Sequence, residues 1–462
     1  MGLPAETGSI FCASALLPDG WARDVRLVVA DGCFTHIERN ASAQSGDSRA
    51  DIVLPGLANV HSHGFQRGMS GLTEYRGPEA DNFWSWRELM YRFVGRMTPE
   101  DLEAVTAQAY VEMLECGFTR VGEFHYVHHD AGGSPYANPA EMAVHVAAAA
   151  EVTGIALTLL PVFYAHGNFG GVAPAPGQKR FTTSLDGFAR LLEASRLAVS
   201  ALPHAVLGVA PHSLRAVAPD ELQAVVGLAA DGPIHIHAAE QTKEVEDCVA
   251  WSGARPVQWL LDNAGVDARW CLVHATHMTD EEIVRLARSG AVAGFCPITE
   301  ANLGDGISPA APFIAAGGTF GIGTDSNVLI SAREELRSLE YSQRLRDRAR
   351  NVLAAQSPHS TGRTLFAHAH RGGARALGMA AAGGTPGLVE GAAADCFSLR
   401  SELPVMAGRQ SDVTLDSFIF GGSTSRIDDV WRAGRKVVEQ GVHCARGEVN
   451  ARYRAALERL VS

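Results

Sequence analysis

Two histidines that are one residue apart, His61 and His63, follow a short apolar run of this chain. In an extended strand, residues i and i+2 point to the same side, about 6–7 Å apart, so both imidazoles can converge on one ion. His237 and Asp325 also stand at the ends of apolar runs. Three imidazole nitrogens and one carboxylate are typical ligands of a first-row metal ion that keeps room for water. The spacing therefore predicts a metal site, with Zn2+ as the expected ion and Fe2+ as the alternative.

A second histidine, His235, lies on the same strand face as His237, so spacing alone leaves this ligand open. His237 is nearer the end of the expected strand and stands three residues before Glu240, which places that carboxylate above the metal. We therefore expect His237 to be the ligand and His235 to lie in the core or around the ligands. His274 ends a further apolar run. Taken alone, Asp325 could instead cap a helix, because Ser326 and Asn327 follow it.

The elements that must position these residues are apolar runs that alternate with amphipathic segments. The runs occupy residues 57–60, 120–124, 155–162, 206–210, 233–237, 270–274, 291–295 and 319–322. Helical segments such as 99–116 and 280–289 separate most of them, and Thr279 with Glu282 forms a capping-box pattern. Eight β/α units over roughly 330 residues predict an α/β fold with a closed (β/α)8 TIM barrel, whose chemistry belongs at the carboxyl ends of the strands.

The two ends of the chain share a pattern of short apolar runs and turns that differs from the alternating runs and helical segments of the middle. Asp31-Gly32 is a turn signal near the start, and Ala433-Gly434 is another near the end. This similarity predicts one small β-sandwich domain formed by residues 1–55 and 385–462, with the barrel at 56–384.

Composition restricts the partners. The chain has 39 Lys and Arg against 51 Asp and Glu, a net charge of −12, and it lacks a long basic run, so nucleic acid is not an expected partner. The eight cysteines are scattered without a C-x-x-C motif, which favours free thiols in a reducing compartment. We see neither a signal peptide nor an apolar run typical of a membrane span, so we expect a cytoplasmic protein without a membrane partner.

The combination of motifs resembles the amidohydrolase superfamily. The motifs are Pro55-Gly56-Leu57 before Asn59-Val60-His61-Ser62-His63, then His237-Ala238-Ala239-Glu240, Val273-His274-Ala275 and Gly323-Thr324-Asp325-Ser326. Members with two metals usually bridge them by a carboxylated lysine at the end of the fourth strand. Lys179, Lys243 and Lys436 are the lysines of this chain, and none stands there. The resemblance thus implies one metal, as in the deaminase branch, which shares the His-x-x-Glu arrangement.

Within that branch, three stretches are similar to the formimidoylglutamate deiminases: residues 63–67, 211–215 and 296–306. This resemblance implies hydrolytic deimination of N-formimino-L-glutamate to N-formyl-L-glutamate and ammonia, a step of histidine degradation. It also implies a small-molecule dicarboxylate substrate whose carboxylates are bound by arginine. The substrate-binding residues that it implies are Gln66, Arg87, Tyr126, His212 and Arg215. Two departures from the family pattern, Ile298 and Asn327, fall in expected loops and not at ligand positions.

The implied mechanism uses a metal-activated water. Glu240 would carry a proton to the departing nitrogen, His274 would stabilise the attacking oxygen, and Asp325 would accept the water proton besides binding the metal. An alternative is a deaminase of a guanine- or pterin-like heterocycle, which Arg87 and Arg215 disfavour. A non-catalytic barrel scaffold is the remote alternative. A homodimer is expected by analogy with relatives.

Overall fold

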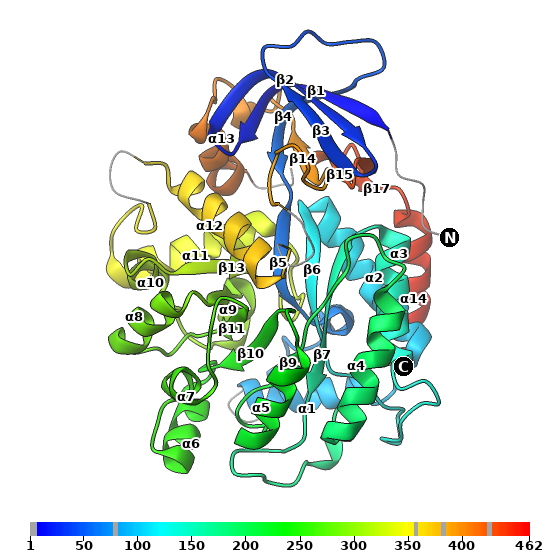
Figure 1. Ribbon diagram of the computed structural model, residues 1–462, viewed down its shortest axis with the longest axis vertical. Coiled ribbons are helices and arrows are strands. Elements are labelled where there is room, and N and C mark those ends of the chain that lie inside the picture. The colour runs from blue at the N-terminus through cyan, green and yellow to red at the C-terminus, as the bar shows by residue number, and fades with distance from the viewer. Residues whose placement is uncertain (1–6, 77–81, 355–358, 380–384, 423–426) are drawn as a thin grey trace.

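The barrel strands carry the site, and all eight predicted apolar runs form strands (Figure 1). The computed structural model describes residues 7–76, 82–354, 359–379, 385–422 and 427–462. The barrel strands are β5 (Leu57–Ser62), β6 (Phe118–His125), β7 (Ala156–Phe163), β8 (Val206–Leu207), β9 (Ala210–Pro211), β10 (Ile234–Ala238), β11 (Trp270–His274), β12 (Val292–Phe295) and β13 (Thr319–Ile322). Strands β8 and β9 are two short pieces of the fourth barrel strand.

Hydrogen bonds close these strands into a ring. The strands are parallel and follow the order β10-β11-β12-β13-β5-β6-β7-β8, with β9 also paired to β7. The ring closes between β9 and β10, because Val209 bridges Ile234 and Ser213 bridges His237. The predicted closed parallel barrel is therefore confirmed.

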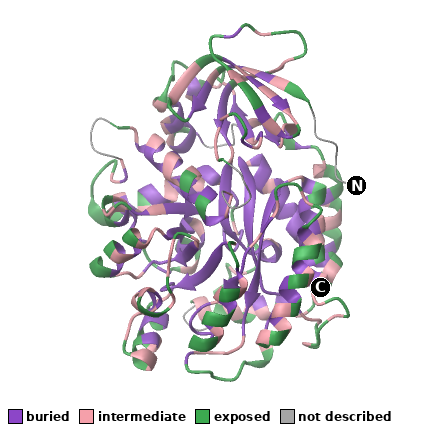
Figure 2. Cartoon of the chain, viewed as in Figure 1, coloured by how far each residue is buried: buried purple, intermediate pink, exposed green. Residues whose placement is uncertain are grey.

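Helices surround the ring and, apart from α2 (Pro99–Glu115), which other helices cover, they have exposed residues on their outer sides, while the strands are buried (Figure 2). The other helices around the ring are α3 (Glu141–Thr153), α4 (Leu185–Val199), α5 (Pro219–Leu228), α6 (Thr242–Ser252), α7 (Pro256–Asn263), α8 (Asp280–Ser289), α10 (Ala310–Ala315), α11 (Ala332–Asp347) and α12 (Thr361–Ala376). The predicted cap of α8 is confirmed: the Thr279 hydroxyl accepts the Glu282 N–H, and the Glu282 carboxylate accepts the Thr279 N–H.

Four further elements lie at the carboxyl ends of the strands. They are the 3-10 turns η1 (Gly64–Met69) and η2 (Pro176–Gln178) and the helices α1 (Phe83–Val94) and α9 (Pro297–Leu303). Helix α1 begins at Asn82, whose side chain accepts the N–H groups of Trp84 and Ser85. The turn η1 and the helices α1 and α9 contribute side chains to the pocket described below.

Both ends of the chain contribute to a second sheet, as predicted. Its strands are β1 (Gly8–Leu17), β2 (Gly20–Ala30), β3 (Cys33–Glu38), β4 (Ser48–Pro55), β14 (Cys396–Leu399), β15 (Ile427–Arg432), β16 (Arg435–Glu439) and β17 (Val442–His443). They form one continuous sheet in the order β17-β16-β15-β14-β4-β1-β2-β3. The sheet curls over its own core, since Gly434 after β15 contacts Val29 of β2. The predicted sandwich thus consists of a single folded-over sheet.

Helix α14 (Arg446–Val461) follows the last strand of this sheet and packs on the barrel. Three shorter elements, η3 (Pro404–Met406), α13 (Asp412–Asp416) and η4 (Ser417–Gly421), connect β14 to β15. Helix α14 binds α2 through the ion pair of Arg452 with Glu103 and that of Arg459 with Asp101. We propose domain boundaries at residues 55 and 385; the predicted barrel end at 384 lies outside the described residues.

None of the helices in the described part of the chain combines the length and the apolar composition that crossing a membrane requires.

One close contact between helix and barrel generates a prediction. A Cβ at Gly372 of α12 would overlap the carbonyl oxygen of Phe320 in β13. Overpacking of a core costs about 1–3 kcal/mol, so we expect Gly372→Ala to lower the midpoint of thermal unfolding. The matched control is Gly227→Ala in α5, where a Cβ meets nothing within 4 Å and helix propensity favours alanine by roughly 0.5–1 kcal/mol. Equal midpoints for the two variants would contradict the close packing of α12.

Candidate metal centre and active site

Four predicted ligands converge at one end of the barrel. His61 and His63 come from the end of β5, His237 from β10, and Asp325 follows β13. The Nε2 atom of His61 lies 3.2 Å from that of His63 and 3.1 Å from that of His237. An Asp325 carboxylate oxygen lies 3.3 Å from the Nε2 atoms of both His61 and His63. One ligand atom of each residue lies within 4.8 Å of all the others, so the predicted group comes together in space.

The outward nitrogens fix the orientation of two of the imidazoles. His63 Nδ1 donates to the Phe124 carbonyl at 3.0 Å, and His237 Nδ1 donates to the His212 carbonyl at 3.1 Å. With the proton on Nδ1, each Nε2 presents its lone pair to the centre, as metal-binding histidines do. Unprotonated nitrogens that face one another at this distance are stabilised by a cation between them. The donor set therefore fits a metal ion.

The protonation states also fit a metal. Burial lowers the pKa of His61 to about 3 and lowers the pKa values of His63 and His237, so all three are neutral at pH 7. Burial alone would raise the pKa of Asp325, but its contacts with His61 and the other histidines bring it below the ordinary value. Neutral imidazoles and an ionised carboxylate are the forms that ligate metals.

Asn327 ties the first and last barrel strands together at the site. Its Nδ2 donates to the carbonyls of His63 and Asp325 at 3.0 and 3.1 Å and to the Ser62 hydroxyl at 3.1 Å. Its Oδ1 accepts the Thr324 hydroxyl at 2.6 Å. Asn327 has φ +55°, a conformation that asparagine tolerates better than most residues. As expected, Asn327 lies in a loop and is not itself among the ligands, but its side chain braces the backbone of two of them.

His274 lies among three carboxylates beside the ligands. Its Nε2 is 3.8 Å from a Glu240 oxygen and 3.8 Å from an Asp325 oxygen, and its Nδ1 is 3.4 Å from Glu300 Oε1. Burial lowers the pKa of His274, but the charges of Glu240, Glu300 and Asp325 outweigh this effect and raise it to about 10. The ring is thus held as a cation at neutral pH.

Glu240 is aimed into the site by a buried carboxylate that sequence reasoning missed. Glu244 accepts the backbone N–H of Ala239 at 3.1 Å and that of Glu240 at 3.0 Å. These bonds stabilise a turn in which Ala239 has φ +52°. Burial raises the pKa of Glu240 more than the nearby charges of His274 and Arg215 lower it. A carboxyl of raised pKa is suited to carrying protons near neutral pH.

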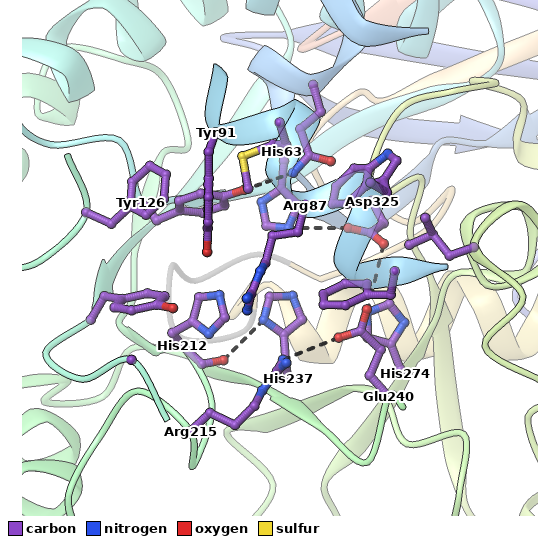
Figure 3. Close-up of a pocket in the computed structure, with 18 residues that line it drawn as sticks. His63, Arg87, Tyr91, Tyr126, His212, Arg215, His237, Glu240, His274 and Asp325 are labelled. Carbon is purple, nitrogen blue, oxygen red and sulfur yellow. Dashed lines mark hydrogen bonds and ion pairs between the residues drawn. The ribbon is translucent and has the colours of Figure 1, made fainter. Parts of the chain in front are cut away.

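A pocket opens over the ligand group, and three of the four ligands, His63, His237 and Asp325, line it (Figure 3). All five residues expected to bind substrate line it, namely Gln66, Arg87, Tyr126, His212 and Arg215. Gln66 Nε2 donates to the Tyr126 hydroxyl at 2.8 Å. Aromatic residues that the sequence did not single out also line the pocket: Phe83, Trp86, Tyr91, Tyr164 and Phe181. Gly167, from the Gly- and Pro-rich loop before Lys179, lies in the wall as well.

The two arginines enter the pocket from opposite sides in Figure 3. Arg215 lies 3.6 Å from a Glu240 oxygen. Arg87 has a buried Nε without a hydrogen-bond partner, and its guanidinium makes no ion pair with any described residue. Such a cation is available to an anionic ligand.

The remaining histidines lie outside the ligand group. His235 Nε2 donates to the Ala376 carbonyl at 2.7 Å, as expected for a core residue. His128 and His129 bond to the carbonyls of Val162 and Thr182. Neither these two nor His125 join a metal-binding group among the residues that the structure describes.

Comparison with known proteins agrees with this geometry. A family description, Amidohydrolase family, matches residues 52–437. The chain belongs to the amidohydrolase family. A second description, Formimidoylglutamate deiminase HutF, N-terminal domain, matches residues 7–51 of this amidohydrolase.

Individual relatives of this amidohydrolase span almost its whole length. A formimidoylglutamate deiminase of Pseudomonas aeruginosa is 50% identical over 437 residues, covering 94% of this chain and 95% of the relative. An 8-oxoguanine deaminase of the same species is 28% identical over 94% of this chain and 95% of the relative. The crystal structure of an amidohydrolase from Brucella melitensis is 56% identical, has a TM-score of 0.95, and covers 98% and 100% of the two chains. The predicted resemblance is confirmed.

The ligand geometry predicts different metal contents for two histidine variants of β10. We expect His237→Asn to purify with little metal, because the loss of a direct ligand should exceed the roughly 10- to 100-fold cost of losing an outer contact. The control, His235→Asn, should keep close to one ion per chain, since its side chain bonds to a carbonyl in the core. Elemental analysis of the purified proteins measures this difference. Metal loss in the His235 variant alone would reverse the assignment.

Proposed function

We propose that this amidohydrolase is a formimidoylglutamate deiminase that acts in histidine degradation. Water adds its oxygen to the formimino carbon of N-formimino-L-glutamate, the bond from that carbon to the imino nitrogen breaks, and both water protons finally reside on the departing nitrogen. The products are N-formyl-L-glutamate and ammonia. The similarity to the deiminase of Pseudomonas aeruginosa, at both the barrel and the N-terminal sheet, supports the proposal.

One observation carries the choice of substrate. Arg87 and Arg215 line the same pocket as three of the four candidate metal ligands, in a chain whose net charge is −12. Guanidinium groups bind carboxylates strongly and in a defined geometry. Arg87 is also without an acidic partner among the described residues. Two cations in one pocket match a substrate with two carboxylates.

We assign the metal to His61, His63, His237 and Asp325, and we take zinc as the ion because this donor set suits it. When bound, such an ion lowers the pKa of a coordinated water toward 7 and supplies the nucleophile. The side chains of all four ligands are buried.

The chain's own residues would move the protons. Glu240 lies between Arg215 and His274, which places its carboxylate to accept a proton from water and donate it to the departing nitrogen. The His274 cation would stabilise negative charge on the attacking oxygen. Asp325, ionised and 3.8 Å from His274, would accept a hydrogen bond or the proton of the water.

The other pocket residues would orient the substrate. Gln66 and Tyr126 are joined by a hydrogen bond and offer neutral donors. His212 lies among positive charges, and burial lowers its pKa well below the ordinary value, so it binds as a neutral imidazole. We assign these three residues, with Arg87 and Arg215, to substrate binding. A homodimer stays a prediction from the resemblance.

A heterocycle deaminase is the second candidate, since an 8-oxoguanine deaminase is 28% identical to the chain. A neutral purine would leave the half-buried Arg87 guanidinium without a counter-charge, which is costly. The arginines therefore favour the dicarboxylate.

Ammonia release tests the proposed function. Zinc-loaded protein should release ammonia from N-formimino-L-glutamate, and at a far lower kcat/KM from a formimino amino acid with an uncharged side chain, because one arginine would lack its carboxylate. Guanine should give none. Turnover of guanine alone would leave the family assignment intact and overturn the substrate.

The role of Glu240 predicts a variant that binds metal but fails in turnover. General acid–base groups contribute about 10²- to 10⁴-fold to rate, so Glu240→Gln should lose kcat within that range while its metal content stays at the level of the unmodified protein. Elemental analysis and steady-state kinetics measure the two properties. Full kcat in this variant would exclude Glu240 as the proton carrier.

A further inference from the structure

Helix α1 contributes aromatic side chains, as well as Arg87, to the wall of the pocket. The Arg87 guanidinium carbon lies 4.5 Å from the centre of the Trp84 ring and 5.5 Å from that of Tyr91. Arg215 comes from a different part of the barrel, yet its guanidinium carbon lies 5.9 Å from the Trp84 ring and 5.8 Å from Phe83. Of the described aromatic residues, Trp84 is the one within cation–π distance of both guanidiniums.

Aromatic support leaves the charge of Arg87 available. A carboxylate that held this guanidinium would neutralise it and compete with an acidic substrate for the same N–H groups. A ring face contacts the guanidinium plane and leaves the N–H groups at its edge free. This arrangement agrees with the unpartnered Nε of Arg87 and with its lack of an ion pair among the described residues.

Trp84 acts through the arginines and not on the substrate. Phe83, Trp86 and Arg87 line the pocket, whereas Trp84 is not among the lining residues. Its ring is partly buried beside both guanidiniums. A group in this place influences where two cations sit relative to each other, and hence the separation of the two carboxylates that they can bind together.

We propose that Trp84 is a positioning residue that sets the spacing of Arg87 and Arg215, and thereby makes the pocket select a dicarboxylate of the length of glutamate over a shorter one. This inference rests on the proposed function, because it takes the two guanidiniums as the carboxylate-binding groups. It predicts that loss of the indole relaxes chain-length selectivity and weakens substrate binding without removing the proton-carrying groups.

The test compares N-formimino-L-glutamate with N-formimino-L-aspartate, which is one methylene shorter. Loss of a cation–π contact worth about 1–2 kcal/mol corresponds to roughly 5- to 30-fold in an equilibrium constant. We therefore expect Trp84→Leu to raise KM for the glutamate substrate by this factor and to lower the glutamate-to-aspartate ratio of kcat/KM, with kcat nearly unchanged. Trp84→Phe keeps a weaker ring and should recover part of both. The matched control is Trp21→Leu in the small sheet, whose indole N–H bonds to Asp412.

Each outcome decides the inference. A glutamate-to-aspartate ratio and KM in Trp84→Leu equal to those of the unmodified protein would overturn it, as would a loss confined to kcat. If the leucine variant does not fold, Trp84→Phe decides, because a ratio equal to that of the unmodified protein would then show that the indole does not set the spacing. Failure of the unmodified protein to act on either formimino substrate would instead overturn the proposed function, so the two failures are distinguishable.

Discussion

The close approach of the His61 Nε2 atom to the Nε2 atoms of His63 and His237, at 3.2 and 3.1 Å, is the constraint on which the rest of the site depends. Their approach requires β5 and β10, on different sides of the ring, to end at the same height. It also requires the chain after β13 to bring Asp325 back beside β5. There, Ser62 forms a β-bridge with Asp325, and the Asn327 side chain donates to the backbone carbonyls of His63 and Asp325. Closure of the barrel and assembly of the metal ligands are therefore one structural event.

Around this centre, buried side chains of opposite charge lie next to one another. Buried carboxylates surround the His274 cation, and Glu240 and Glu244 face Arg215. Removal of one partner from such a group leaves an uncompensated buried charge, which costs more than the contact itself contributes. Arg87 differs from Arg215, because aromatic rings support its guanidinium and it keeps its charge for a ligand.

Much of the site could be predicted from the sequence because its signals are local. Period-two spacing placed His61 and His63 on one strand face, and the alternation of apolar runs with helices predicted the eight strands. Glu244 and Glu300 were missed because their roles depend on a left-handed turn at Ala239 and on contacts between segments 26 residues apart. Trp84 contacts Arg215, and Asn327 contacts His63, across long stretches of sequence. The periodicity of a sequence does not predict such contacts. The folded-over small sheet and the packing of α14 on α2 depend on tertiary contacts for the same reason.

The second sheet combines strands from both ends of the chain, and this affects the order in which the protein can fold during synthesis. Strand β4 pairs with β1 on one side and with β14 on the other, and only Gly56 separates it from β5, which carries two ligands. During synthesis, β1 to β4 emerge first, but the edge of β4 that β14 covers stays unpaired until some 340 further residues have followed. Contacts of such high sequence separation form slowly. Strand β4, which leads into the ligand-bearing β5, therefore acquires its second neighbour only after β14 has been synthesised, and until then its exposed edge is open to wrong pairing.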